Sequence, residues 1–144
     1  MELAEQTIVI TGGASGIGAA LARRFAEESP ANLVLADRDL DGARAVAQAV
    51  APGVSGQCVP RQLDVGRDGA NEALVADVEN NVGPIDLFVA NAGIATGASE
   101  QADDGVWGSI WDINTMAHVR AARALVPLWL ERGGGYLLTT ASAA

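Results

Sequence analysis

The sequence predicts an α/β fold, a doubly wound parallel sheet with helices on both faces. Short apolar runs typical of buried strands alternate with longer segments that carry apolar residues three or four positions apart, as amphipathic helices do. Repeated units of this kind form parallel sheets whose strands are buried by the helices. Right-handed crossovers and one switch point then give the strand order 3-2-1-4-5. The 144 residues, of which 49% are hydrophobic, suffice for one domain with a real core.

The first two strand–helix units occupy the start of the chain. Residues 6–11 are a strand-like run whose apolar centre, residues 8–10, predicts the first strand, and the alanine-rich segment after the following glycines predicts a helix over 18–28. A second apolar run predicts a strand over 32–37. The next helix is expected over 40–51, where proline and glycine follow and end it.

The third and fourth strands are separated by one helix. A strand is expected over 59–65, less regular than the others because it contains Pro60. Residues 67–82 carry apolar side chains on one face and are followed by glycine and proline, which predicts a helix and its end. The run 85–90 predicts the fourth strand.

A long helix and a last strand complete the pattern. Residues 103–132 are expected to be mostly helical, with room for a break or short gap near Gly105. The acidic pair Asp103 and Asp104 suits the N-terminal cap of this helix. Three glycines then end it, and residues 136–140 predict the fifth strand.

Charge and composition exclude several classes of protein. With 18 acidic and 9 basic residues the net charge is −9, which argues against a nucleic-acid partner. No apolar run is long enough to predict a membrane span. The N-terminus is acidic, where a signal peptide would be basic. Cys58 is the only cysteine, so an internal disulfide is impossible and a cytoplasmic location is expected.

A glycine-rich turn between the first strand and the first helix predicts a phosphate site. The start of a helix presents unpaired N–H groups and a partial positive charge, and glycines let the backbone approach a phosphate closely. The first such turn of a Rossmann-type sheet binds the pyrophosphate of a dinucleotide. The residues of the turn expected to bind the cofactor are Thr11, Gly12, Ser15, Gly16, Ile17 and Gly18.

Asp37, at the end of the second strand, predicts that NAD is the cofactor. It lies about twenty residues after the glycine turn, where an acid bonds the ribose hydroxyls of NAD. The 2′-phosphate of NADP would face a like charge, at roughly 4 kcal/mol for unit charges about 4 Å apart and an effective dielectric constant of about 20. The adjacent Arg38 could bind that phosphate, so NADP is the less favoured alternative. Outside a nucleotide site, Asp37 would be a loop-forming acid.

The order of the motifs resembles that of the short-chain dehydrogenase/reductase family. Residues 11–18 match that family's TGxxxGxG turn, a spacing that differs from the GxGxxG of other dinucleotide folds. Residues 91–93 match its NAG motif after the fourth strand. With the further matches below, the resemblance extends to Ser142 and covers nearly the whole chain.

The resemblance places the adenosine half of the cofactor between two motifs. Asp64, with Val65, would meet the adenine amino group. Asn91, Ala92 and Gly93 would let the adenosine lie flat against the sheet. Taken alone, Asp64 could equally be a helix cap or a loop acid, and the Asn-Ala-Gly run could be an ordinary turn.

The resemblance also implies two catalytic residues and shows that two others are missing. Asn114, a poor residue for a helix interior, would hold a water chain beneath the active site, and Ser142 would hydrogen-bond the substrate oxygen. In the family, a tyrosine and a lysine four residues later handle the substrate proton. The chain has no lysine, and its only tyrosine, Tyr136, precedes Ser142. Residues 1–144 are therefore expected to be the N-terminal, NAD(P)-binding part of a larger single-domain protein, truncated after the fifth strand and inactive alone.

The activity implied for the parent protein is hydride transfer between NAD(P) and an alcohol or ketone. Its partners would be that small molecule and, through the helix at 103–132, further copies of itself. The alternative is a non-catalytic dinucleotide-binding or interaction module. No group of His, Cys, Asp and Glu has the spacing of a metal site.

Other conspicuous residues are interpreted as structural. His118 is expected to be a histidine of the helix surface or of an interface. Cys58 is expected to be a small buried hydrophobe. Trp107, Trp111 and Trp129 fit helix packing or a subunit contact.

Overall fold

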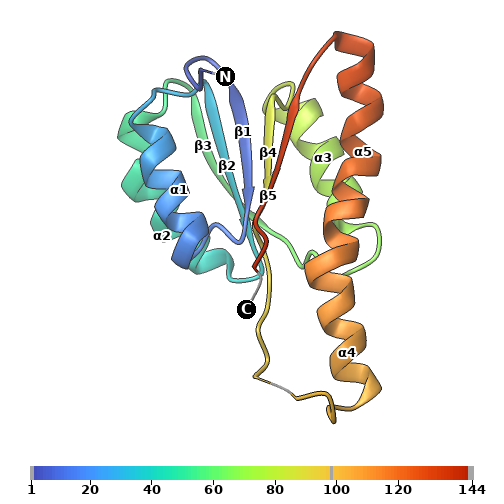
Figure 1. Ribbon diagram of the computed structural model, residues 1–144. Helices are drawn as coiled ribbons and strands as arrows, with labels where there is room; N and C mark the ends of the chain where they lie inside the picture. Colours follow the sequence, from blue (N-terminus) through green and yellow to red (C-terminus); the bar gives the residue numbers. More distant parts are fainter. Residues whose placement is uncertain (1, 98, 143–144) are drawn as a thin grey trace.

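The computed structural model describes residues 2–97 and 99–142, and it confirms the predicted fold class (Figure 1). Five parallel strands form one sheet in the order β3-β2-β1-β4-β5. The strands are β1 (Thr7–Thr11), β2 (Asn32–Asp37), β3 (Gln57–Gln62), β4 (Leu87–Ala90) and β5 (Tyr136–Thr139). The helices are α1 (Gly16–Ala26), α2 (Leu40–Val50), α3 (Ala70–Asn81), α4 (Asp104–Trp111) and α5 (Ala117–Arg132), with a 3₁₀ turn η1 (Ala51–Gly53) and a π-helical segment η2 (Asp112–Met116).

The central strand β1 is buried on both faces. Ile8 and Ile10 pack with α1 and α2, whereas Val9 between them packs with α3 and α5. Because helices cover both faces, the strand does not alternate between apolar and polar residues, and its sequence is a continuous apolar run. The helices α1 and α2 lie on one side of the sheet and α3 and α5 on the other (Figure 1).

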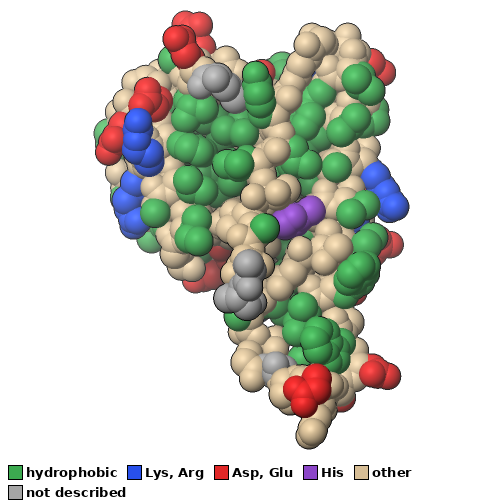
Figure 2. Space-filling model, in the orientation of Figure 1, with side chains coloured by type: hydrophobic (Ala, Val, Ile, Leu, Met, Phe, Trp, Pro, Cys, Tyr) green, Lys and Arg blue, Asp and Glu red, His purple; other side chains and the backbone are tan. Residues whose placement is uncertain are grey.

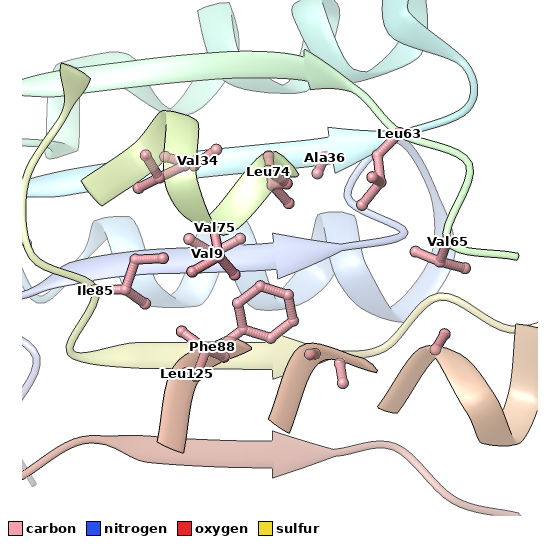
Figure 3. Close-up of a cluster of buried hydrophobic side chains, with 14 of the residues drawn as sticks. Val9, Val34, Ala36, Leu63, Val65, Leu74, Val75, Ile85, Phe88 and Leu125 are labelled. Atoms are coloured by element: carbon pink, nitrogen blue, oxygen red, sulfur yellow. The ribbon is translucent and has the colours of Figure 1, made fainter. Parts of the chain in front are cut away.

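The core on the α3 and α5 side is built around Phe88 (Figure 3). Phe88 is fully buried and shares this cluster with Val9, Val75 and Leu125, which come from three other elements. Burying one side chain of this size stabilises the fold by roughly 1.5–3 kcal/mol. The cluster therefore fixes α3 and α5 on the strands whose ends carry the site.

A polar tie holds α3, α5 and the start of β4 together. Trp129 is buried, and its Nε1 donates to the carbonyl oxygen of Ile85 at 2.7 Å. The Arg132 guanidinium bonds both carboxylate oxygens of Glu79, at 2.7 and 3.0 Å, and also donates to Ile85 O. Gly135 lies against the Trp129 ring, where an added Cβ would overlap the indole. A glycine is therefore needed at the entry to β5.

The break expected near Gly105 in the helix at 103–132 does not occur there. Gly105 lies in the first turn of α4, and Asp103 caps that turn by accepting a hydrogen bond from Val106 N at 2.9 Å. The cap stabilises the turn, so no break occurs there. The irregularity lies further on, at η2 (Asp112–Met116), where the helix widens into a π turn that contains Asn114.

The third strand ends earlier than the predicted 59–65. After Gln62 the chain turns, because Asp64 Oδ1 accepts a hydrogen bond from Gly66 N at 3.0 Å. A side-chain-to-backbone bond of this kind replaces strand pairing with a turn. α3 then starts at Ala70, after Gly69 with its left-handed φ of 73°, and not at residue 67.

The carboxyl ends of the strands meet at one edge of the sheet. Thr11 pairs with Ala36, and Ala90 pairs with Thr139. The chain runs outward from β1 to β2 and β3, then returns to the other side of β1 to form β4 and β5. This reversal leaves a crevice between the loops that follow β1 and β4, the usual place for a ligand in an open α/β sheet.

Candidate functional site

A crevice of about 420 Å³ opens at this edge, where the predicted motifs converge. It is bounded by the glycine turn, by the ends of β2 and β3 and by the loop after β4. Its lining residues are Gly12, Ser15, Gly16, Ile17, Asp37, Arg38, Leu63, Asp64, Val65, Asn91, Ala92, Gly93, Ile94, Ile113 and Thr140.

The structure places four of the predicted site residues outside this lining. These residues are Thr11, Gly18, Asn114 and Ser142. The lining residues that sequence reasoning missed are Leu63, Ile94, Ile113 and Thr140. Each of the first three directly precedes or follows a predicted motif residue, and that adjacency was the available signal.

The glycine turn brings a bare helix start to the crevice. Gly12 and Gly16 have φ values of 69° and 51°, which favour glycine, and an added Cβ at Gly16 would have no atom within 4 Å. Ser15 is the N-cap residue of α1, yet its side chain makes no capping hydrogen bond. The first turn of α1 can therefore receive an anion from the crevice side.

Gly18 has a packing reason to be glycine. An added Cβ would overlap the carbonyl oxygen of Gly12 and lie 2.9 Å from Nδ2 of Asn91. The turn folds back tightly on the first turn of α1, and only hydrogen fits between them. Gly18 thus shapes the turn without facing the crevice.

Thr11 is buried and holds the loop after β4. Its hydroxyl oxygen accepts hydrogen bonds from the backbone N–H groups of Asn91 and Ala92, at 3.0 and 3.1 Å, and the hydroxyl donates to Val89 O at 3.3 Å. One donor and two acceptor positions are the full capacity of a hydroxyl group. Thr11 therefore positions the Asn-Ala-Gly motif and has no bond left for a ligand.

The Asn91 side chain joins the glycine turn to β5. Its Nδ2 donates to Thr11 O at 3.1 Å and to Gly12 O at 3.5 Å, and its Oδ1 accepts from the Thr140 hydroxyl at 3.0 Å. These bonds tie the first, fourth and fifth strands at the floor of the crevice. A small amide here is needed for the architecture of the site.

Asp37 is both a lining residue and a brace of the glycine turn. Its two carboxylate oxygens accept hydrogen bonds from Ala14 N and Asp39 N, each at 3.0 Å. An ionised carboxylate has about four acceptor positions, so two remain for hydroxyl donors in the crevice. Arg38 lines the same crevice and adds a positive charge beside that carboxylate.

Asp64 and Val65 form the opposite wall. Asp64 holds its own turn through Gly66, and Val65 O accepts a 3.0 Å hydrogen bond from Nδ2 of Asn71, which is only 1% exposed. Leu63 N donates to Asp37 O at 2.9 Å, which links this wall to the end of β2. The wall is therefore held in place by bonds on both sides.

Asn114 binds the loop after β4 through both of its side-chain polar atoms. Its Oδ1 accepts from Ile94 N and its Nδ2 donates to Ile94 O, each at 2.9 Å. The role of Asn114 in a water chain stays a prediction. Ser142 is exposed, two residues beyond Thr140.

Two further titratable groups differ from their ordinary state because of burial. Burial raises the pKa of the Cys58 thiol to about 11, so this half-buried cysteine is protonated at neutral pH and is no nucleophile. Burial also lowers the pKa of His118. Within residues 2–97 and 99–142, no three His, Cys, Asp or Glu side chains are grouped to hold a metal ion.

The chain is similar to known oxidoreductases over its whole length. The family model for short chain dehydrogenases matches residues 6–144. The dehydrogenase/reductase SDR family member 4 of the rabbit, Oryctolagus cuniculus, is 35% identical over 99% of this chain and 55% of its own. The chain spans about half the length of the curated relatives it matches, 46% of one fungal short chain dehydrogenase from Pseudocercospora fijiensis among them.

Solved structures match the fold closely. A metagenomic short-chain oxidoreductase in complex with NADP has a TM-score of 0.89 and 27% identity, over all of this chain and 65% of that one. L-sorbose reductase from Gluconobacter frateurii, complexed with NADPH and L-sorbose, has a TM-score of 0.86 and 33% identity, over 99% of this chain and 55% of its own.

Proposed function

Because the chain belongs to the short chain dehydrogenase family, we propose that it is the NAD(P)-binding part of an oxidoreductase that acts on an alcohol or carbonyl substrate. The observation that carries this proposal is the crevice at the switch point of the sheet, where the glycine turn presents the uncapped start of α1. Neighbouring structures with the same fold hold NADP or NADPH. When bound, the cofactor supplies the hydride acceptor or donor.

Different residues of the crevice would hold the pyrophosphate, the adenine and the ribose of the cofactor. The pyrophosphate would lie on the turn at Gly16 and Ile17, where backbone N–H groups and the helix dipole favour a negative charge. The adenine would lie against Asp64 and Val65. The free acceptor positions of Asp37 would bind ribose hydroxyls.

We propose NAD as the preferred cofactor, with Asp37 as the reason. A 2′-phosphate beside an ionised carboxylate would be repelled. Arg38 in the same crevice would attract that phosphate. The two structural neighbours named above also hold NADP or NADPH, so NADP is the alternative. The balance between the neighbouring carboxylate and guanidinium decides the choice.

The proton transfer of the reaction is proposed to depend on residues outside positions 1–144. The chain has no lysine, and Tyr136 lies in β5, ahead of Ser142. Asn114 and Ser142 are the members of the proposed catalytic group that this chain contributes.

Self-association is proposed through α4 and α5. Trp107, Trp111, Val126 and Leu130 are large apolar side chains that are 42–78% exposed on these helices. Figure 2 shows hydrophobic side chains at the surface along this side of the molecule. Among the described residues, no helix is long and apolar enough to cross a membrane. A cytoplasmic location stays a prediction from the sequence.

Calorimetric titration of the chain with NAD, NADP and ADP tests the proposed function. We expect saturable binding of all three, because each carries the pyrophosphate that the turn would hold. The variant Asp41→Asn, an exposed carboxylate outside the crevice, should bind equally well. Absence of binding to the unaltered chain would contradict the proposal.

A further inference from the structure

Arg120 on α5 contacts two segments that adjoin lining residues of the crevice, the loop after β3 and the start of η2, but does not line the crevice itself. Its side chain is only 13% exposed, and its guanidinium bonds Asp112 Oδ1 at 3.0 Å. The same guanidinium lies 3.4 Å from Gly66 O and 3.6 Å from Asp68 Oδ1. Asp112 begins η2, the π turn of Asn114, whereas Gly66 and Asp68 follow the proposed adenine wall.

Packing reinforces this link between the two segments. An added Cβ at Gly66 would lie 2.8 Å from Cγ1 of Ile113, the residue next to Asn114. Ile113 itself lines the crevice. The loop after β3 and the π turn are therefore in direct contact, and Arg120 holds that contact from outside.

The chemistry of arginine suits this position. A guanidinium presents five donors in a fixed plane, so one side chain can bond a carboxylate on one segment and a carbonyl on another. Asp68 is 97% exposed and Asp112 is 46% exposed, so both carboxylates remain hydrated if the arginine is removed. Loss of Arg120 should loosen the link without unfolding the core.

We propose that Arg120 is a positioning residue that couples the Asp64–Val65 wall to the Asn114–Ile94 pair. Its use in catalysis rests on the proposed function. A nucleotide that orders the loop after β3 also restrains Arg120, which bonds Asp112 at the start of η2. The position of η2, and with it that of the Asn114 side chain, is thereby fixed. Cofactor binding at the adenine end thereby sets the position of a residue at the reacting end.

Hydrogen exchange by NMR tests the coupling in the free chain. The informative amides are Gly66 N–H, which donates to Asp64, and Ile94 N–H, which donates to Asn114. In Arg120→Met, which keeps an apolar stem, exchange at both amides should rise about tenfold, the scale for losing one charge-assisted bond. Amides of β1 should not change, because the core is intact.

Two variants show whether the effect belongs to this link. Asp112→Asn removes the carboxylate on the π-turn side and should speed exchange at Ile94. Arg123→Met, on the next turn of α5 at an exposed position, should leave both amides unchanged. Unchanged exchange at Ile94 in Arg120→Met, or an equal rise across β1, would overturn the proposal.

Addition of AMP separates this inference from the proposed function. AMP should slow exchange at Gly66 and Ile94 in the unaltered chain, but only at Gly66 in Arg120→Met. Slowing at both amides in the variant would refute transmission through Arg120. If AMP binds to neither protein while the free-chain effect is present, the coupling holds and the nucleotide function fails.

Discussion

The hydroxyl of Thr140, at the end of the edge strand β5, donates a 3.0 Å hydrogen bond to the side-chain oxygen of Asn91, at the end of β4. Asn91 donates in turn to the backbone of the glycine turn. The floor of the crevice is therefore a chain of polar bonds that spans three strands. Each bond can be tested by removing one donor.

Removal of the Thr140 hydroxyl should weaken both the fold and the site. In Thr140→Val, Asn91 Oδ1 loses its partner, and the unfolding free energy should fall by about 1 kcal/mol, the net value of one such bond. Urea unfolding measures this. Thr139→Val, at an exposed neighbouring position, is the control and should change the unfolding free energy little. Equal losses in the two variants would mean that the bond is not formed.

A methyl group at Gly18 should disrupt the glycine turn. Gly18→Ala would place Cβ on the Gly12 carbonyl, and we expect a loss of roughly 1–3 kcal/mol in unfolding free energy, as for overpacked sites, together with weaker ADP binding. Gly108→Ala is the matched control in α4, because a Cβ there meets nothing within 4 Å. Gly108→Ala should stabilise the chain by about 0.5–1 kcal/mol through helix propensity. Urea unfolding of both variants gives the comparison.

Asp37→Ala should shift the cofactor preference toward NADP. Loss of the carboxylate removes the repulsion of a 2′-phosphate and leaves Arg38 free to bind it. The measured quantity is the ratio of the NAD and NADP dissociation constants, because the lost bonds to Ala14 and Asp39 weaken both cofactors alike. Asp41→Ala controls for net charge. An unaltered ratio would show that Asp37 does not face the ribose.

His118 should make the stability depend on pH. Burial lowers its pKa in the folded chain, so the unfolded chain binds the proton more readily. Its contribution to stability is therefore complete above the unfolded pKa of about 6.5 and is lost as the pH falls through the folded value. His118 is the only histidine, so His118→Gln should flatten the stability curve as the pH falls below the unfolded value. The purple histidine in Figure 2, beside hydrophobic side chains, is the group removed. Urea unfolding at several pH values checks this, and an equally steep curve in the variant would assign the slope to carboxylates.

The 144-residue chain should show no dehydrogenase turnover, although it should bind nucleotide. Proton transfer needs a positioned acid and base, and the chain lacks the lysine of the family's pair. The assay follows NADH absorbance with simple alcohols, on protein whose mass is verified. Measurable NADH formation above a Ser142→Ala control would contradict the prediction.

The fold could be predicted because its determinants are local. Continuous apolar runs, helical periodicity and glycine turns are written in neighbouring residues, and together they gave the correct strand order. The ends of elements were less accurate, because β3 ends where Asp64 bonds Gly66, and α3 begins only after Gly69 with its left-handed φ. Such features depend on individual side-chain geometry.

Most of the residues predicted for the site line the crevice, but the hydrogen bonds that each of them makes could not be predicted. Thr11 and Asn91 match cofactor motifs, yet their side chains are occupied by hydrogen bonds within the protein. Thr11 and Asn91 bond each other although they are 80 positions apart, and Asn91 also bonds Thr140 after β5. The π turn could not be foreseen, since the pairing of Asn114 with Ile94 that accompanies it joins residues 20 positions apart in the chain. Contacts between distant segments decide these roles.

The π turn determines how the side chains of α4 are rotated about the helix axis relative to those of α5. Each residue of an α-helix advances the azimuth by about 100°, so one extra residue in the turn at Asp112–Met116 rotates every α4 side chain relative to α5. A shortened turn would change the direction in which Trp107 and Trp111 point around the helix axis. It would also move Asn114 away from Ile94. The number of residues in the π turn therefore determines both which side chains α4 exposes on its outer surface and whether Asn114 reaches Ile94 beside the crevice.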